Sequence, residues 1–230
     1  MLTIHTAELL LPGAGLPAVR GGAVALEGGL IEAVGPYEEL AAALPRARTR
    51  HWPGLLTPGL VHPAAAALLE DAYHPDPREA ESLGTAPLAG AALSALAMDE
   101  GRWGGSARRG LQRLLAHGVT GVAGPFRRAP VRTAVRRSGL VEVRRTVPPG
   151  TAPLSGPPVL DPLALLPPES LFAGTLAPGA RADLAVFAVP AAADAADAAD
   201  GPGPLAALRE AGAATCAATV LGGRLVHRTR

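Results

Sequence analysis

The chain has 230 residues, of which 48% are hydrophobic and 18% charged, and its formal net charge is +1. This balance excludes an intrinsically disordered chain and allows one large domain or two small ones with a real core. Apart from histidine, every basic side chain is arginine. The lack of lysine excludes a Schiff-base lysine, a Walker-type phosphate loop and a carboxylated lysine between two metals.

The first part of the chain is predicted to form short strands with tight turns, over residues 2–35. Gly28-Gly29 separates two alternating apolar runs, which is the pattern of a β-hairpin. A short helix is expected over 37–43 and an extended segment over 46–52. The N-terminal residues have no basic leader, so we expect no secretory signal. No apolar run is long enough to cross a bilayer, and we expect no membrane association.

The middle of the chain, residues 57–170, has a different pattern. Apolar periodicity predicts a helix over 106–117, with Ser106 as its N-cap and Gly118 at its C-terminal end. After it we expect a buried strand at 119–123, a second short helix at 131–137 and another strand at 140–147. The many prolines of residues 148–168 predict an irregular segment.

The C-terminal part returns to β character. Residues 173–187 predict a turn that leads into a buried strand, and 217–226 predict a second hairpin around Gly222-Gly223. The low-complexity segment over 191–204 predicts a flexible surface loop. Cys216 is the single cysteine, so no internal disulfide can form, and we expect a cytoplasmic protein.

Oxygen and nitrogen donors are densest between residues 70 and 81. Asp71, His74 and Asp76 could meet around a divalent ion or serve as acid-base groups. The alternative is a solvated loop followed by a helix start, with Pro77 in the first turn. His62 is a further candidate metal ligand. Its alternative is a capping or solvent-facing role, because a metal needs several convergent ligands.

The most basic stretch contains seven arginines between Arg127 and Arg145, opposed in sequence by Glu142 alone. Such a stretch is compatible with an anion or nucleic-acid surface. The aromatic content is only 3%, however, which leaves little for stacking on bases. Arginine also performs every ordinary surface role in a chain without lysine. We therefore expect no nucleic-acid partner.

Several short blocks occur in an order that resembles the amidohydrolase superfamily, and within it the imidazolonepropionase and aminodeoxyfutalosine deaminase group. The blocks are GGLIEAVG at 28–35, TPGLVH at 57–62, HGVTGV at 117–122, LAPGARADLAV at 176–186 and VLGGRLV at 220–226. Each block alone has modest specificity, whereas the ordered set is specific.

The resemblance implies an α+β fold with two parts. A composite β-sandwich would be built from both chain ends, residues 1–56 together with 171–230. Residues 57–170 would form a truncated (β/α) barrel remnant. A complete barrel needs ~250 residues, and this segment has roughly 115, enough for about three or four strand-helix units.

In this superfamily a His-x-His pair at the end of the first barrel strand holds a divalent metal. The matching positions here are Ala64 and Ala66, whose methyl groups have no lone pair to give a metal. We therefore expect no cofactor. The leading hypothesis is a pseudoenzyme, a non-catalytic binding or accessory module. Lost barrel units would expose apolar surface, so a homodimer or a heteromeric partner is expected.

The sequence leaves open whether the chain is an enzyme. The alternative function that the resemblance implies is a divergent hydrolase acting on carbon-nitrogen (non-peptide) bonds of cyclic amides or amino-heterocycles. It would use a divalent metal, zinc or iron, to activate water. Asp71, His74 and Asp76 would then supply the donors.

Overall fold

The computed structural model describes residues 1–144, 158–190 and 203–229. A large mixed sheet takes strands from both ends of the chain, in the order β13-β12-β11-β5-β1-β3-β4, with β2 paired to β1. The strands are β1 (Leu2–Leu10), β2 (Val19–Arg20), β3 (Gly22–Glu27), β4 (Leu30–Pro36), β5 (Arg48–Pro58), β11 (Leu184–Phe187), β12 (Cys216–Leu221) and β13 (Arg224–Arg228). The fold class is therefore α+β, as predicted.

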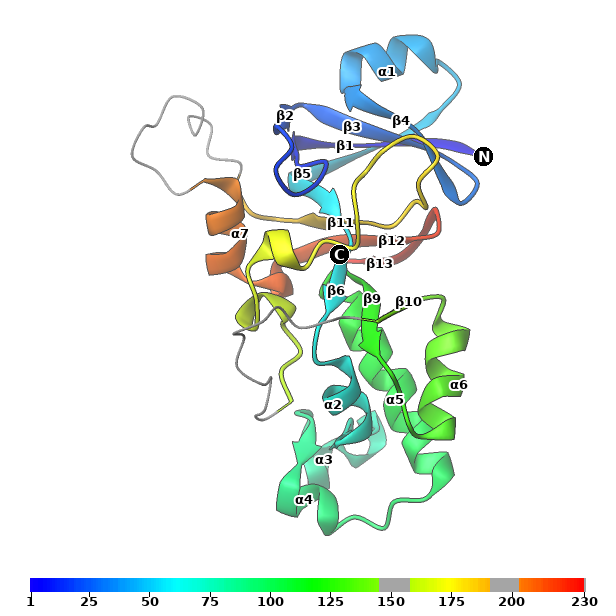
Figure 1. The fold of residues 1–230 in the computed structure, drawn as a ribbon, viewed down its shortest axis with the longest axis vertical. Helices are drawn as coiled ribbons and strands as arrows, with labels where there is room; N and C mark the ends of the chain where they lie inside the picture. The colour runs from blue at the N-terminus through cyan, green and yellow to red at the C-terminus, as the bar shows by residue number, and fades with distance from the viewer. Residues whose placement is uncertain (145–157, 191–202, 230) are drawn as a thin grey trace.

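Strand β5 lies near the centre of this sheet and joins its two halves. It pairs in parallel with β1 along most of its length, from Thr3 opposite Arg48 to Leu10 opposite Leu56. Its second half pairs antiparallel with β11, with Leu55 opposite Phe187. Because β11 enters from the C-terminal part, the two ends of the chain share one hydrogen-bonded sheet (Figure 1).

The predicted hairpins at both ends are confirmed. The β3–β4 turn contains Gly28, and the β12–β13 turn contains Gly222 and Gly223, all three with positive φ angles. The predicted short helix is also present, as α1 (Tyr37–Ala43), and Leu40 is its buried residue. These elements were predictable because a turn or an amphipathic turn of helix depends on neighbouring residues alone.

A smaller sheet follows from β5. It contains β6 (Leu60–His62), β9 (Val119–Gly124) and β10 (Val141–Arg144), all parallel, in the order β10-β9-β6. The helices that follow or connect these strands are α2 (Ala65–Glu70), α5 (Glu100–Leu115) and α6 (Ala129–Ser138). Figure 1 shows the large sheet in the upper half and α2, α5 and α6 in the lower half, with β6 leading from one to the other.

Helix α5 starts earlier than predicted. Asp99 is its N-cap and accepts a hydrogen bond from the backbone N–H of Arg102 at 2.7 Å. Ser106, the expected N-cap, lies inside the helix and is fully buried. The prediction was wrong because the early turns carry three glycines, which have low helix propensity, and tertiary packing of Trp103 outweighs that propensity.

Between α2 and α5 the chain forms several short elements. They are β7 (Ala72–Tyr73), the 3-10 turn η1 (Pro77–Glu79), α3 (Ala80–Leu83), β8 (Leu88–Ala89) and α4 (Gly90–Ser94). Strands β7 and β8 pair antiparallel. The predicted helix start at Pro77 is therefore correct.

The free side of β6 is covered by a later part of the chain. The backbone N–H of Val61 donates to the carbonyl of Leu171 at 2.7 Å, and that of Ala173 donates to the carbonyl of Gly59 at 2.8 Å. Leu60 and Phe172 also form a β-bridge. Since this segment satisfies the backbone of β6, the strand is not an open sheet edge.

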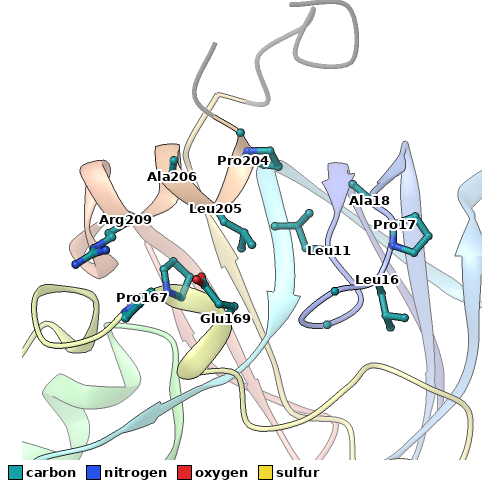
Figure 2. Close-up of a pocket in the computed structure, with 14 residues that line it drawn as sticks. Leu11, Leu16, Pro17, Ala18, Pro167, Glu169, Pro204, Leu205, Ala206 and Arg209 are labelled. Atoms are coloured by element: carbon teal, nitrogen blue, oxygen red, sulfur yellow. The ribbon is translucent and has the colours of Figure 1, made fainter. Parts of the chain in front are cut away.

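The remaining short elements are η2 (Pro162–Ala164), η3 (Pro168–Ser170), α7 (Pro204–Ala211) and η4 (Ala213–Thr215). Together with the loop after β1, η3 and α7 line a cavity of about 880 Å³ (Figure 2). Part of the irregular segment predicted at 148–168, and most of the loop predicted at 191–204, lie outside the described residues. None of the helices in the described ranges is long and apolar enough to cross a membrane.

One hydrophobic cluster connects the two sheets. Phe187 from the large sheet is fully buried, and its ring lies against Gly118, where an added Cβ would be 2.7 Å from ring atom Cζ. Gly118 also has a φ of +72°, so both its backbone conformation and its lack of a side chain are required. The Thr219 hydroxyl donates to the carbonyl of Leu115 at 2.6 Å across the same contact. The division into domains 1–56 with 171–230 and 57–170 stays a prediction.

Replacing Phe187 by alanine should lower the free energy of unfolding by about 3–5 kcal/mol, because it leaves a cavity where the two sheets meet. Urea unfolding followed by circular dichroism measures this change. Val226→Ala, at a side chain that is 41% exposed, is the control and should change it by less than about 0.5 kcal/mol. Equal effects of the two substitutions would contradict the role of Phe187.

Candidate functional site

Ligand sites in sheets of parallel strands lie at the carboxyl ends of the strands, so a site is expected at the end of β6. Strand β6 ends at His62, and helix α2 begins three residues later. Ala64 is the N-cap residue of α2, and Ala66 lies in its first turn. The two positions that match the family's histidine ligands therefore lie just after the end of the strand, and both carry methyl side chains.

His62 is fully buried, so the prediction of a capping or solvent-facing role is wrong. Its Nε2 donates to the carbonyl of Val159 at 2.9 Å, and Nδ1 has no hydrogen-bond partner among the described residues. Burial, as the largest cause, lowers the pKa of His62 to about 4. The ring is thus neutral at pH 7 and held by the main chain of a distant segment.

The donor set at this strand end does not fit a metal ion. Within the described ranges, no three histidine, cysteine, aspartate or glutamate side chains lie close enough together to hold one. A divalent metal needs several convergent ligands, and His62 has one ring nitrogen already engaged. No chemical step through a metal can be built from these residues.

The three candidate residues of the loop after α2 have separate surroundings. Asp71 is the exposed C-cap residue of α2. His74 is fully buried, its Nε2 donates to the carbonyl of Leu68 at 3.1 Å, and burial lowers its pKa to about 4. Asp76 is the N-cap of η1 and forms an ion pair with Arg109 at 3.3 Å.

His74 is enclosed by helix α5. Its backbone N–H donates to the Ser106 hydroxyl at 2.8 Å, and its ring lies so close to Gly110 that an added Cβ would be 2.7 Å from Nε2. Nδ1 has no partner in the described part of the chain. The geometry makes His74 a packing residue between the loop and α5, whereas its use as an acid-base group would require access that the helix blocks.

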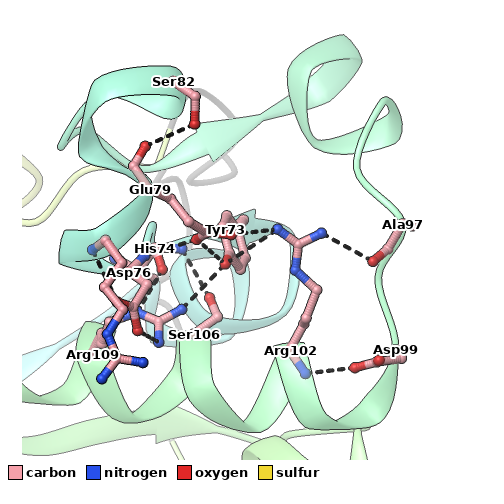
Figure 3. Close-up of polar contacts among 11 residues, drawn as sticks. Tyr73, His74, Asp76, Glu79, Ser82, Ala97, Asp99, Arg102, Ser106 and Arg109 are labelled. Atoms are coloured by element: carbon pink, nitrogen blue, oxygen red, sulfur yellow. Dashed lines mark hydrogen bonds and ion pairs between the residues drawn. The ribbon is translucent and has the colours of Figure 1, made fainter.

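A polar network that the sequence did not reveal surrounds Tyr73 (Figure 3). The Tyr73 hydroxyl donates to Glu79, and Arg102 donates to the other Glu79 oxygen at 2.8 Å. Arg102 and Arg109 also lie over the Tyr73 ring, at 4.9 and 5.6 Å from its centroid. Burial is the largest cause that raises the pKa of Tyr73. These residues line a depression of about 370 Å³, in which each charged group of Arg102, Arg109, Asp76 and Glu79 already has a partner.

Glu70 is a buried carboxylate whose contacts sequence reasoning missed. It is 2% exposed, and one oxygen accepts the backbone N–H groups of Arg127 and Arg128, both at 2.6 Å. The second oxygen forms an ion pair with Arg127 at 3.7 Å. Glu142 is the only acidic residue within the arginine-rich stretch, and Glu70 adds a carboxylate from outside it. Glu70 instead fixes the start of α6 to the end of α2.

Comparisons with known proteins agree with the resemblance seen in the sequence. Residues 22–47, which span β3, β4 and α1, match the family described as imidazolonepropionase-like composite domain, bacteria. The expected likeness to the amidohydrolase superfamily is confirmed by this match. No curated protein sequence matches the chain.

Several solved structures match part of the chain at low identity. Ochratoxinase from A. niger is 22% identical over 62% of this chain and 30% of its own, with a TM-score of 0.42. Guanine deaminase from Bradyrhizobium japonicum is 16% identical over 62% and 34%, with a TM-score of 0.43. Aminofutalosine deaminase from Helicobacter pylori is 13% identical over 62% and 32%, with a TM-score of 0.40. The chain thus spans about a third of the length of these structures.

Acidification should destabilise the protein through its buried neutral imidazoles. The pKa of His5, like those of His62 and His74, is lowered to about 4 from the usual 6.5, chiefly by burial. The unfolded chain binds protons below pH 6.5 that the folded chain does not, so the stability present above pH 6.5 is lost as the pH falls towards 4. Lowering the pH from 7.5 to 5 should reduce the free energy of unfolding by about 2 kcal/mol for each of the three rings.

Urea unfolding at both pH values measures this loss. The variant His74→Gln should show a smaller difference between the two pH values than the unsubstituted protein, whatever its absolute stability. An unchanged difference would mean that His74 does not remain neutral in the folded state.

Glu70→Ala should lower the free energy of unfolding by about 3 kcal/mol, because two backbone N–H groups lose their charged acceptor. Chemical denaturation measures the loss, and Glu70→Gln should recover part of it because its amide oxygen can still accept. Glu81→Ala, at an exposed carboxylate of the same region, is the matched control. A loss from Glu70→Ala no larger than the control's would contradict the capping role of Glu70.

Proposed function

We propose that this chain is an amidohydrolase-like protein that acts by binding rather than by catalysis. In this proposal the large sheet is the composite β-sandwich region of the family. The parallel strands β6, β9 and β10, with their helices, are a remnant of the (β/α) barrel. A complete barrel has eight such strands, and catalytic residues of barrel enzymes come from the ends of several of them.

The observation that carries the proposal is the donor chemistry at the end of β6. Ala64 and Ala66 stand at the positions of the expected metal ligands, and the imidazole of His62 is buried against the carbonyl of Val159. A methyl group cannot ligate a metal, and a single buried imidazole cannot hold one alone. A site without its metal would have no means to activate water in the way of the related hydrolases.

The proposed role is that of an accessory subunit, a scaffold or a ligand-binding module, alone or with a homodimeric or heteromeric partner. Its single cysteine, Cys216, is buried, and burial raises its pKa to about 11, so a reactive thiol is not part of the proposal. A cytoplasmic location is proposed from the lack of any cysteine pair. The hydrolase alternative gains no support from Asp71, His74 and Asp76, because Asp71 is exposed, His74 is enclosed and Asp76 is paired with Arg109.

Metal analysis of the purified full chain tests the proposal. Protein expressed in medium with added zinc and iron and then passed through a desalting column should contain far less than one equivalent of either metal. Inductively coupled plasma mass spectrometry measures both. A stoichiometric metal that survives the column would overturn the proposal, and loss of that metal in His62→Ala would place it at the end of β6.

A further inference from the structure

Strand β10 is an uncovered edge of the small parallel sheet in the described part of the chain. It is the end strand in the order β10-β9-β6, and among the described residues no backbone segment other than β9 pairs with it. Every second residue of an end strand directs its backbone N–H and C=O groups away from the sheet. Val141 on this strand is 36% exposed. The edge therefore offers both hydrogen-bonding groups and an apolar side chain to an added strand.

The surface around this edge is basic. Six of the seven arginines of the arginine-rich stretch lie in the described ranges, and all six are exposed: Arg127, Arg128, Arg132, Arg136, Arg137 and Arg144. Glu142 is the exposed carboxylate of the same stretch, whereas Glu70 is buried and accepts hydrogen bonds from the backbone at the start of α6. Positive charge thus exceeds negative charge along α6 and β10.

Three of these arginines lie near the two ends of β10. Arg136 and Arg137 belong to the last turn of α6, which Gly139 joins to the strand, and Arg144 is the last residue of β10. Within the residues that the structure describes, none of the three forms an ion pair or a side-chain hydrogen bond. Figure 1 shows α6 leading into β10 on the side of the small sheet away from β6. Three uncompensated cations therefore accompany the uncovered edge.

We propose that the uncovered edge of β10 binds an extended acidic segment of a partner protein, which adds to the small sheet as a further strand. Backbone hydrogen bonds give affinity to such an added strand, and its side chains give selectivity. Acidic side chains are attracted by Arg136, Arg137 and Arg144, whereas basic side chains are repelled. This inference rests on the proposed binding function and names its partner class.

Two other occupants use only part of this surface. A second copy of the chain could pair its own β10 with the edge, but it would bring a second set of exposed arginines to the same place, and like charges repel. A nucleic acid would neutralise the arginines, but its phosphate backbone cannot continue a β-sheet. An acidic strand uses the backbone edge and the positive charges together.

Three peptides with one pattern test the pairing: acetyl-EVEVEVE-amide, acetyl-KVKVKVK-amide, and the acidic peptide with an N-methyl group on every residue. Fluorescence anisotropy of the labelled peptides with the full chain at pH 7 should give an affinity for the acidic peptide at least tenfold above that for the basic one. The N-methylated peptide should also bind at least tenfold more weakly, because it keeps every charge and loses every backbone donor. Only the peptide changes, so the result does not depend on the folding of a variant.

Two double variants of equal charge assign the cations. Arg136→Gln combined with Arg144→Gln should lower the affinity for the acidic peptide at least fivefold. Arg46→Gln combined with Arg224→Gln removes the same charge from exposed positions in other elements, and it should leave the affinity unchanged. Urea unfolding curves of both variants should match that of the unsubstituted protein, because exposed substitutions of this kind have little effect on stability.

The inference is overturned if the acidic peptide does not bind at millimolar concentration, if N-methylation leaves its affinity unchanged, or if the two double variants bind it alike. Tighter binding of a single-stranded oligouridylate, lost in the Arg136→Gln and Arg144→Gln variant, would assign the surface to nucleic acid instead. A dimer in sedimentation velocity that the acidic peptide dissociates would assign the edge to a second copy. Either result also overturns the inference.

Metal content measured on the same preparation separates this inference from the proposed function. Metal-free protein that does not bind the acidic peptide refutes the assignment of the β10 edge alone. Metal-loaded protein that binds the acidic peptide and rejects its N-methylated form refutes the non-catalytic function and leaves the assignment of the edge intact.

Discussion

The antiparallel pairing of β11 with β5 is the interaction on which the rest of the structure depends. It attaches Leu184–Phe187 to the second half of β5, on the edge opposite the one that pairs with β1. The N-terminal and C-terminal strands thereby become one sheet with a continuous apolar face. The same pairing directs Phe187 towards Gly118 at the start of β9. The helical half of the molecule is thus fixed to the large sheet by the strand that unites the two chain ends.

The small parallel sheet raises a physical problem, because a strand without a neighbour exposes unpaired backbone groups. On the β6 side the chain solves it with its own later segment, through the Val61–Leu171 and Gly59–Ala173 hydrogen bonds. Val159 approaches the end of the same strand and binds the His62 ring. The free side of β6 is therefore covered by main chain, and the same segment contacts the His62 side chain at the end of the strand.

The sequence predicted features that depend on adjacent residues, and it did not predict features that depend on residues distant in the chain. The glycine hairpins, α1 and the helix start at Pro77 depend on adjacent residues and were predicted correctly. The N-cap of α5 was misplaced to Ser106, because that hydroxyl serves the backbone of His74, a partner 32 residues away. The burial of His62 and the capping of α6 by Glu70 were equally hidden, since their partners are 97 and 57 residues distant. A pattern read along one segment cannot show which distant carbonyl or N–H will meet a polar side chain.

The polar groups of this fold differ in whether they are buried, paired or exposed. A general acid or base needs a pKa near the working pH and reach to a substrate. His62 and His74 have pKa values lowered to about 4, and both rings are fully buried and bound to carbonyls. The charged groups around Tyr73 are paired with one another, and Glu70 is used by the backbone of α6. Glu169 and Arg209 differ from all of these, because they are exposed beside an apolar cavity and keep their hydrogen-bonding capacity.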